Sequence, residues 1–263
     1  MKIAIFQFAP RFAQVEANLQ KIEHAVQGVD FDLLILPELC TTGYQFVSHE
    51  EVVELAEAIP EGPTTERLTR LAREKSAHIV ASLAEKEGEQ LYNSAALVGP
   101  EGLVGKYRKL HLFDEEKLFF NRGNLGLPVW DIGTAKIGLL ICFDWIFPEA
   151  ARTLALKGAD VLCQPANLIL PYCQDAMVTR ALENRVFTVT ANRVGAEARG
   201  GKPQLVFTGK SQVVAPNGER LLQFSEREER LRVVEIHPEA ARDKWITPRN
   251  HLFEERRPDA YTV

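Results

Sequence analysis

The 263-residue sequence contains few cysteines, and none of them is spaced for a disulfide scaffold or a metal site. The four are Cys40, Cys142, Cys163 and Cys173. No two of them form a Cys-x-x-Cys pair, and the six histidines never lie four positions apart, as two zinc ligands on one helix would. We therefore expect no metal ion and no disulfide framework. The cysteines serve either in packing or, for one of them, as a nucleophile.

Long apolar runs are also missing. None approaches the roughly 18 residues that a membrane span needs. The apolar start, residues 1–8, is followed by Arg11 and by no small-residue cleavage site, which argues against a secretory signal peptide. We expect a cytoplasmic protein that does not bind membranes.

Neither sign of charge dominates the sequence. Its 36 acidic and 31 basic residues give a net charge of −5, and the densest basic stretch is only residues 106–109. A protein that binds nucleic acid usually carries a larger basic patch. Nucleic acid is therefore not an expected partner, and a small molecule is.

Several common enzyme motifs are absent. There is no Gly-x-Gly-x-x-Gly and no Gly-x-Ser-x-Gly. The stretch Gly209-Lys210-Ser211 resembles the end of a phosphate loop, but Gln204 stands where that loop requires glycine. These absences argue against a dinucleotide-binding domain, a P-loop enzyme and a serine α/β-hydrolase, and no organic cofactor is indicated.

Segments of strand and helix character alternate along almost the whole chain. Periodicity and turn signals predict strands over 2–8, 32–36, 78–84, 91–98, 103–109, 136–141, 160–164 and 186–191, and helices over 16–28, 64–75, 148–157 and 174–185. Further strands follow residue 206. The pattern predicts a single α/β domain over residues 1–263 with mixed sheets. The polar tail, about 240–263, packs either on this body or on a second subunit.

Three reactive residues each follow a predicted strand. Glu38 follows the strand over 32–36, Lys109 ends the strand over 103–109, and Cys142 follows the strand over 136–141. In open α/β sheets, ligand sites gather at the carboxyl ends of strands. A single buried cysteine is usually a core residue. A carboxylate at the end of an apolar strand, however, is costly unless it is paired. The three together therefore indicate one catalytic pocket.

The chemistry of these three residue types fits nucleophilic attack on a carbonyl carbon. A lysine ammonium near a cysteine favours the reactive thiolate, and a nearby carboxylate can take the thiol's proton. The backbone N–H of Phe143 and the Lys109 ammonium could then stabilise the oxyanion of a tetrahedral intermediate. Tyr44, Trp145 and Asn167 also follow strand ends, and we regard them as candidates for substrate binding.

The contexts of these residues resemble the nitrilase superfamily, also called carbon–nitrogen hydrolases, and most closely its short single-domain amidase and nitrilase members. The likeness covers nearly the whole chain in the same order. The matching segments are Leu34-Ile35-Leu36-Pro37-Glu38 with Thr42-Gly43-Tyr44, Tyr107-Arg108-Lys109-Leu110-His111-Leu112-Phe113, Gly138-Leu139-Leu140-Ile141-Cys142-Phe143-Asp144, Pro148-Glu149-Ala150-Ala151-Arg152, Gln164-Pro165-Ala166-Asn167 and Arg180-Ala181-Leu182-Glu183-Asn184-Arg185.

This resemblance implies a four-layer α-β-β-α sandwich that forms a homodimer or a multiple of dimers. It also implies a Glu38–Lys109–Cys142 triad and a second carboxylate shortly after the lysine. By offset that carboxylate is Glu116, with Asp114 and Glu115 as adjacent alternatives. No cofactor is implied.

The sequence therefore predicts an amidase that hydrolyses a small non-peptide amide, an aliphatic amide, ω-amide or carbamoyl compound, through a cysteine thioester. The main alternative is an aliphatic nitrilase, since the same residues can attack a nitrile carbon. An alternative of another class is a catalytically silent ligand-binding protein of the same fold. Keeping all three reactive residues argues against the silent protein.

Overall fold

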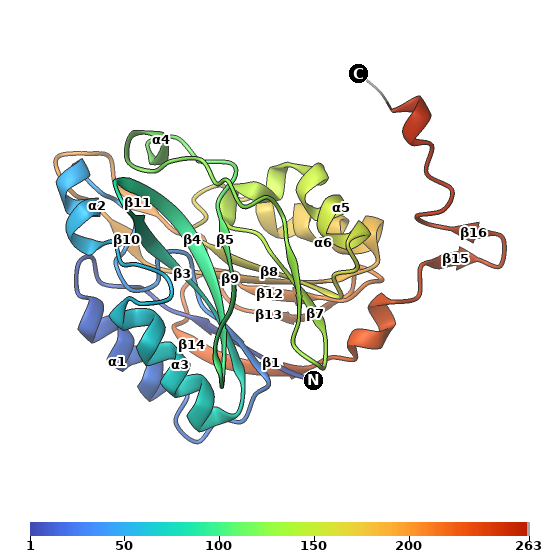
Figure 1. The fold of residues 1–263 in the computed structure, drawn as a ribbon, viewed down its shortest axis with the longest axis horizontal. Coiled ribbons are helices and arrows are strands. Elements are labelled where there is room, and N and C mark those ends of the chain that lie inside the picture. Colours follow the sequence, from blue (N-terminus) through green and yellow to red (C-terminus); the bar gives the residue numbers. More distant parts are fainter. Residues whose placement is uncertain (262–263) are drawn as a thin grey trace.

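The computed structural model describes residues 1–261 and contains two six-stranded sheets (Figure 1). In spatial order, the first sheet comprises β14 (Arg230–Glu235), β1 (Lys2–Gln7), β2 (Leu33–Ile35), β3 (His78–Glu87), β4 (Gln90–Gly99) and β5 (Gly102–Arg108). The second comprises β13 (Arg220–Gln223), β12 (Gln212–Val214), β9 (Phe187–Asn192), β8 (Val161–Ala166), β7 (Lys136–Leu139) and β6 (Val129–Asp131). Both sheets are mixed: β1, β2 and β3 run parallel, as do β7, β8 and β9, and the remaining pairs are antiparallel.

The two sheets pack face to face, and helices cover their outer faces. Strand side chains alternate between faces, so Ile3 and Ile5 enter the core that both sheets share, whereas Ala4 packs outward. The outer face of the first sheet is covered by α1 (Val15–Ala25) and α3 (Pro63–Lys75), and that of the second by α5 (Pro148–Leu156) and α6 (Cys173–Asn184). Figure 1 shows the two helix pairs on opposite sides of the sheets. The predicted α-β-β-α sandwich is confirmed.

Local signals explain where these elements begin and end. Both α3 and α5 start at a proline, whose missing N–H costs nothing in the first helical turn. After α5, Gly158 adopts a φ of +87°, a conformation that glycine reaches without strain. Gly88, at φ +60°, makes the tight turn between β3 and β4. Among the described residues, no helix has the length and apolar character needed to cross a bilayer.

The structure differs from the predicted elements at several points. Helix α2 (His49–Leu55) and the single-turn α4 (Glu116–Phe119) were not expected, because they are too short to show helical periodicity. The predicted strand over 136–141 ends at Leu139. Ile141 is apolar, but its N–H donates to the Asp144 carboxylate rather than to a neighbouring strand. Short strand pairs β10–β11 (Ala196–Glu197, Leu205–Val206) and β15–β16 (Trp245–Thr247, Asn250–His251) complete the fold.

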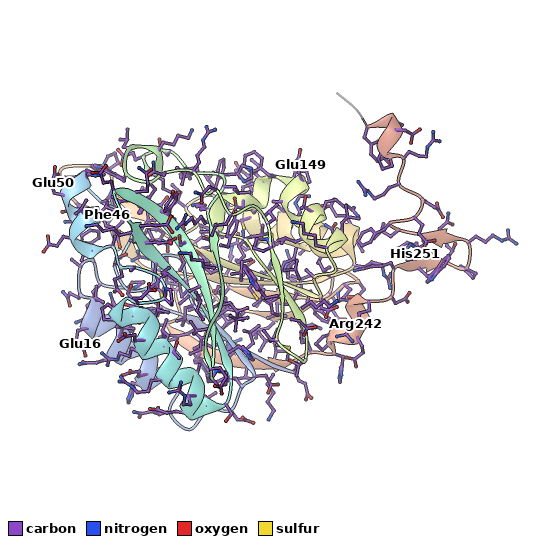
Figure 2. All side chains as sticks on the ribbon, in the orientation of Figure 1. Glu16, Phe46, Glu50, Glu149, Arg242 and His251 are labelled. Carbon is purple, nitrogen blue, oxygen red and sulfur yellow. The ribbon has the colours of Figure 1, made fainter. Side chains whose placement is uncertain are left out.

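The C-terminal tail leaves the body after residue 242. Figure 1 shows it extending along one side of the sandwich, and in Figure 2 the labelled Arg242 and His251 mark its path. Phe253 of the tail packs against the main core, and the Arg152 guanidinium lies over its ring. Lys244 anchors its start by donating to the carbonyls of Asn184 and Arg185 at the end of α6. The predicted tail runs to residue 263, and its last two residues lie outside the part of the chain that the structure describes.

Candidate active site

The ends of strands from both sheets meet at one place. Glu38 follows β2 and Lys109 follows β5 of the first sheet, while Cys142 and Asn167 follow β7 and β8 of the second. All four residues are almost completely buried. Because the sheets pack face to face, residues far apart in the sequence meet in one buried cluster.

Lys109 lies between two carboxylates. Its Nζ atom is 2.7 Å from Glu38 Oε1 and 2.7 Å from Glu116 Oε1, and its side chain is fully buried. Burial lowers the pKa of Lys109, but the charges of Glu116 and Glu38 raise it more, so the net pKa lies above its ordinary value. The lysine therefore remains an ammonium and holds both carboxylates.

The two oxygens of the Glu38 carboxylate have different surroundings. Oε1 accepts hydrogen bonds from Lys109 Nζ and from the Asn93 side chain, each at 2.7 Å. Oε2 is buried and has no hydrogen-bond partner within the protein. A buried carboxylate oxygen without a donor is costly. This oxygen is therefore available to accept a proton.

Cys142 adopts a strained conformation at the start of the 3-10 helix Cys142–Ile146. Its φ is +44°, in the left-handed region that side chains disfavour by about 1–3 kcal/mol. Gln164 Nε2 donates to the Cys142 carbonyl at 2.8 Å, and the Asp144 carboxylate accepts from Ile141 N–H at 2.8 Å. Neighbouring groups thus hold the cysteine where the strand turns into the helix.

The electrostatics of Cys142 differ from what the sequence led us to expect. Burial raises the pKa of the Cys142 thiol well above its ordinary value, the Glu38 and Glu116 charges raise it further, and Lys109 opposes them. The expectation that Lys109 alone would favour the thiolate is therefore wrong for the resting protein. The thiol stays protonated, so its proton must be removed as it reacts.

Of the three candidates for the second carboxylate, the structure brings only Glu116 to the lysine. Asp114 and Glu115 are exposed, and Glu115 pairs with Lys202. Burial raises the pKa of Glu116 to about 7, with Lys109 lowering it and Glu38 raising it. Its other oxygen accepts from Phe113 N–H at 3.2 Å.

Tyr44, a predicted substrate-binding residue, lies at this cluster. Its hydroxyl donates to Glu116 Oε1 at 2.7 Å. The turn that carries it is held by Glu197 in β10, whose carboxylate accepts the N–H groups of Tyr44 and Gln45 at 3.1 Å and 2.6 Å. Glu197 is in turn paired with the buried Arg193 at 2.5 Å.

The other predicted site residues line a narrow cavity at the cysteine. Asn167 donates to the Glu38 carbonyl at 2.9 Å, and its own side-chain oxygen is buried without a partner in the protein. The cavity, of about 20 Å³, is lined by Phe113, Cys142, Phe143, Trp145, Asn167, Leu168, Ile169 and Leu170. A second cavity, of about 250 Å³, shares Phe113 and Ile169 with it and is bordered by Tyr44 and Glu116.

Sequence reasoning missed four polar residues that shape the site: Asn93, Asp144, Gln164 and Glu197. Asn93 and Gln164 stand inside strands that are otherwise buried, and a buried polar side chain needs a specific partner. A polar residue within a buried strand was therefore the signal that could have identified Asn93 and Gln164. Nothing in the local pattern marked Glu197.

Comparison with known proteins identifies the family. The family model described as carbon–nitrogen hydrolase matches residues 2–244. The chain belongs to the carbon–nitrogen hydrolase family. As a family member it is 50% identical to a protein of Pyrococcus abyssi named nitrilase, over 99% of both chains. It is 37% identical to an (R)-stereoselective amidase of a Pseudomonas species, over 90% of this chain and 85% of that one.

Solved structures of the family have the same fold. The amidase from a Nesterenkonia species superposes with a TM-score of 0.77 at 31% identity and covers 92% of each chain. This carbon–nitrogen hydrolase is therefore an amidase- or nitrilase-type enzyme of the nitrilase superfamily.

Proposed function

We propose that this enzyme is an amidase that hydrolyses small non-peptide amides through a thioester on Cys142. The observation that carries the proposal is the asymmetry of Glu38. One of its oxygens accepts hydrogen bonds from Lys109 and Asn93, whereas the other is buried and has no partner in the protein, and the charge of Glu38 acts on the Cys142 thiol. This is the arrangement that a general base needs.

In the first step, Glu38 takes the proton of the Cys142 thiol while the sulfur attacks the amide carbon. The electron pair of the C=O bond moves to the oxygen. Lys109 and the Phe143 N–H stabilise that oxyanion, since Phe143 lies in the first turn of the 3-10 helix, where N–H groups lack helical acceptors. The raised pKa of Cys142 makes the base necessary.

In the second step, the tetrahedral intermediate collapses and the C–N bond breaks. Glu38 returns its proton to the departing nitrogen, which leaves as ammonia or an amine, and a thioester remains. Water then gives a proton to Glu38 and its hydroxide adds to the thioester carbon. Collapse releases the acid, and the cysteine sulfur takes the proton back. Glu116 orients Lys109 throughout.

The cavity at Cys142 favours a small acyl group. Its volume is about 20 Å³, room for roughly one water-sized group. Phe143, Trp145 and Leu170 supply apolar walls, and the unpartnered Asn167 oxygen can accept from the substrate nitrogen. Aliphatic amides, ω-amides and carbamoyl compounds with small acyl groups are the proposed substrates.

A nitrilase is the second candidate, favoured by the name of the Pyrococcus abyssi relative at 50% identity. The same thiol can add to a nitrile carbon. The test is release of ammonia and acid from matched amides and nitriles by the wild type and by Cys142→Ala. Cysteine-dependent release from amides supports the amidase. Release from nitriles alone replaces it with the nitrilase, and no release from either overturns both.

We also propose a homodimer in which the tail contributes to the interface. The tail exposes Trp245 and Ile246, and Leu156 of α5 and Leu182 of α6 are exposed as well. An isolated two-stranded hairpin such as β15–β16 is marginally stable in water. A second copy of this chain would cover both apolar surfaces.

We also propose that the protein is a single domain over residues 1–263 and is located in the cytoplasm. The core shared by both sheets supports one cooperative unit, for which a single unfolding transition is the test. All four cysteines are free and buried, which suits a reducing compartment. Fractionation of the source cells tests that location.

A further inference from the structure

One buried carboxylate joins the chain segment that carries Lys109 to the segment that carries Cys142. The Asp144 side chain is completely buried. Its Oδ2 accepts from Ile141 N–H and from the Tyr107 hydroxyl, each at 2.8 Å. Its Oδ1 lies 2.7 Å from His111 Nδ1 and accepts from His111 N–H at 3.3 Å. Four contacts thus converge on a single residue.

The residues that Asp144 holds flank the reactive ones. Lys109 lies midway between Tyr107 and His111, and Cys142 lies between Ile141 and Asp144. β5 and β7 belong to different sheets, and no ladder of backbone hydrogen bonds joins them. The spacing between the lysine and the cysteine therefore depends on side chains, and Asp144 bonds to both segments.

The anchors on the lysine side are themselves firmly held. Tyr107 is fully buried in the core that both sheets share, and its hydroxyl also accepts from Leu110 N–H at 3.1 Å. The His111 ring stacks on Phe147, with 3.7 Å between the ring centroids. Because movement of either Tyr107 or His111 would disturb this packing, the bridge that Asp144 forms between the two segments is rigid.

The cysteine side of the bridge stores strain. Cys142 has a φ of +44°, which persists only where the surroundings over-determine it. The bond from Ile141 N–H to Asp144 fixes the residue before the cysteine, and the side chain of Gln164 fixes its carbonyl. Without Asp144, the turn could relax and carry the thiol away from Lys109.

We propose that Asp144 is a positioning residue, whose carboxylate sets the spacing between the Lys109 ammonium and the Cys142 thiol. The proposal rests on the proposed function, since it assigns a purpose to that spacing. Asp144 does not touch the reacting atoms. It acts through the two segments that it joins.

The test compares Asp144→Asn with Asp160→Asn. Asp160 is a matched control: it is also buried, and it accepts from a backbone N–H, that of Lys136, at 3.0 Å. It precedes β8, at the opposite end from the site. In Asp144→Asn, the amide cannot accept all four contacts. We expect kcat to fall about 100-fold, the scale of a 1 Å misplacement, with KM within about threefold. Asp160→Asn keeps the wild-type kcat.

A second readout does not depend on any substrate. The rate at which iodoacetamide alkylates Cys142 is followed against pH, after alkylation of the intact and Cys142→Ala proteins has identified the reacting thiol. Of the charges that act on this thiol, Glu38 and Glu116 raise its pKa and Lys109 lowers it. Displacing Lys109 in Asp144→Asn moves the alkylation profile to higher pH, and Asp160→Asn leaves it in place.

Other outcomes decide against the proposal. If Asp144→Asn lowers the melting temperature but keeps both kcat and the alkylation profile, Asp144 is merely structural. Equal losses of kcat in both variants also overturn it. If Asp144→Asn does not fold, Tyr107→Phe removes one of the donors to Asp144 instead. Its control is Tyr92→Phe, which changes another buried tyrosine, on β4. Only Tyr107→Phe should then shift the alkylation profile, and an unchanged profile overturns the proposal.

The two proposals fail in different ways. If the wild type releases ammonia from no amide or nitrile, the proposed function is wrong. The alkylation profiles of Asp144→Asn and Asp160→Asn still measure whether Asp144 holds Lys109 beside the thiol.

Discussion

The Tyr44 hydroxyl donates a 2.7 Å hydrogen bond to Glu116 Oε1, the same oxygen that accepts from Lys109 at 2.7 Å. Burial raises the pKa of Glu116 to about 7, although Lys109 and the Tyr44 hydroxyl both lower it. Burial and the Glu116 charge also raise the pKa of Tyr44 well above its ordinary value, so the phenol remains a donor. The second carboxylate of the site therefore titrates near neutral pH.

This raised pKa makes the stability of the protein depend on pH. The folded state binds the Glu116 proton more tightly than the unfolded chain, whose ordinary pKa is 4.5. The contribution is fully present below pH 4.5 and is lost as the pH rises to about 7. Relative to Glu116→Gln, the wild type should lose about 2–3 kcal/mol of unfolding free energy across this window.

Urea unfolding of wild type and Glu116→Gln between pH 4 and pH 8 measures that difference in unfolding free energy. Glu115→Gln, which removes an exposed carboxylate from the same turn, is the control. Parallel stability curves for wild type and Glu116→Gln would contradict the prediction.

Cys142→Ala should abolish turnover and keep the fold. Cys142 is small and only 5% exposed. The alanine variant removes its buried thiol, which lies near two carboxylates. Circular dichroism and a melting curve test the fold, and ammonia release tests activity. Cys163→Ala, a buried cysteine in β8, is the matched control and should retain activity. Measurable turnover by Cys142→Ala would rule out the thioester route.

Replacing Lys109 by methionine should destabilise the protein strongly. The variant leaves Glu38 and Glu116 buried without their cation, and removing one partner of a buried ion pair costs about 3–5 kcal/mol. The loss should be larger at pH 8 than at pH 5, because the carboxylates can be neutralised by protons at low pH. Chemical unfolding at both pH values measures it.

A second substitution separates charge from shape in this experiment. Glu38→Gln combined with Lys109→Met removes one buried carboxylate along with the cation. The double variant should therefore recover part of the lost stability and remain inactive. If it is no more stable than Lys109→Met alone, packing rather than charge explains the loss.

The tail predicts a measurable change in oligomeric state. Trp245→Ser with Ile246→Ser removes two side chains that are 49% and 54% exposed. We expect light scattering to show dimers for the wild type and monomers for the double variant at micromolar concentration. Val53→Ser, an exposed residue on α2 away from the tail, is the control. If light scattering shows that the wild type is already a monomer, the dimer proposal is wrong.

Much of the site was predictable because its main residues sit at strand ends. Glu38 and Cys142 each follow a run of apolar residues, which predicts a buried strand, and Lys109 ends a predicted strand of mixed polarity. Hydrophobic runs fix which segments are buried, and the βα connections fix at which end a polar residue emerges. The pattern predicted an α/β domain with mixed sheets, and the family resemblance implied the α-β-β-α arrangement.

The supporting residues were not predictable in the same way. Asn93 meets Glu38 across 55 positions of sequence, and Glu197 meets Gln45 across 152. Such pairs depend on strand register and on how the two sheets pack, which local periodicity does not encode. The choice among Asp114, Glu115 and Glu116 likewise depended on burial, because all three have the same side-chain chemistry.

The two sheets share no backbone ladder, yet each supplies half of the reactive groups: Glu38 and Lys109 from the first, Cys142 and Asn167 from the second. The rate of hydrolysis therefore depends on how the two sheets are positioned relative to each other. A substitution in the shared core that slides one sheet by about 1 Å should lower kcat about 100-fold. Selection for turnover in this protein is, in the same act, selection for the fit between its two halves.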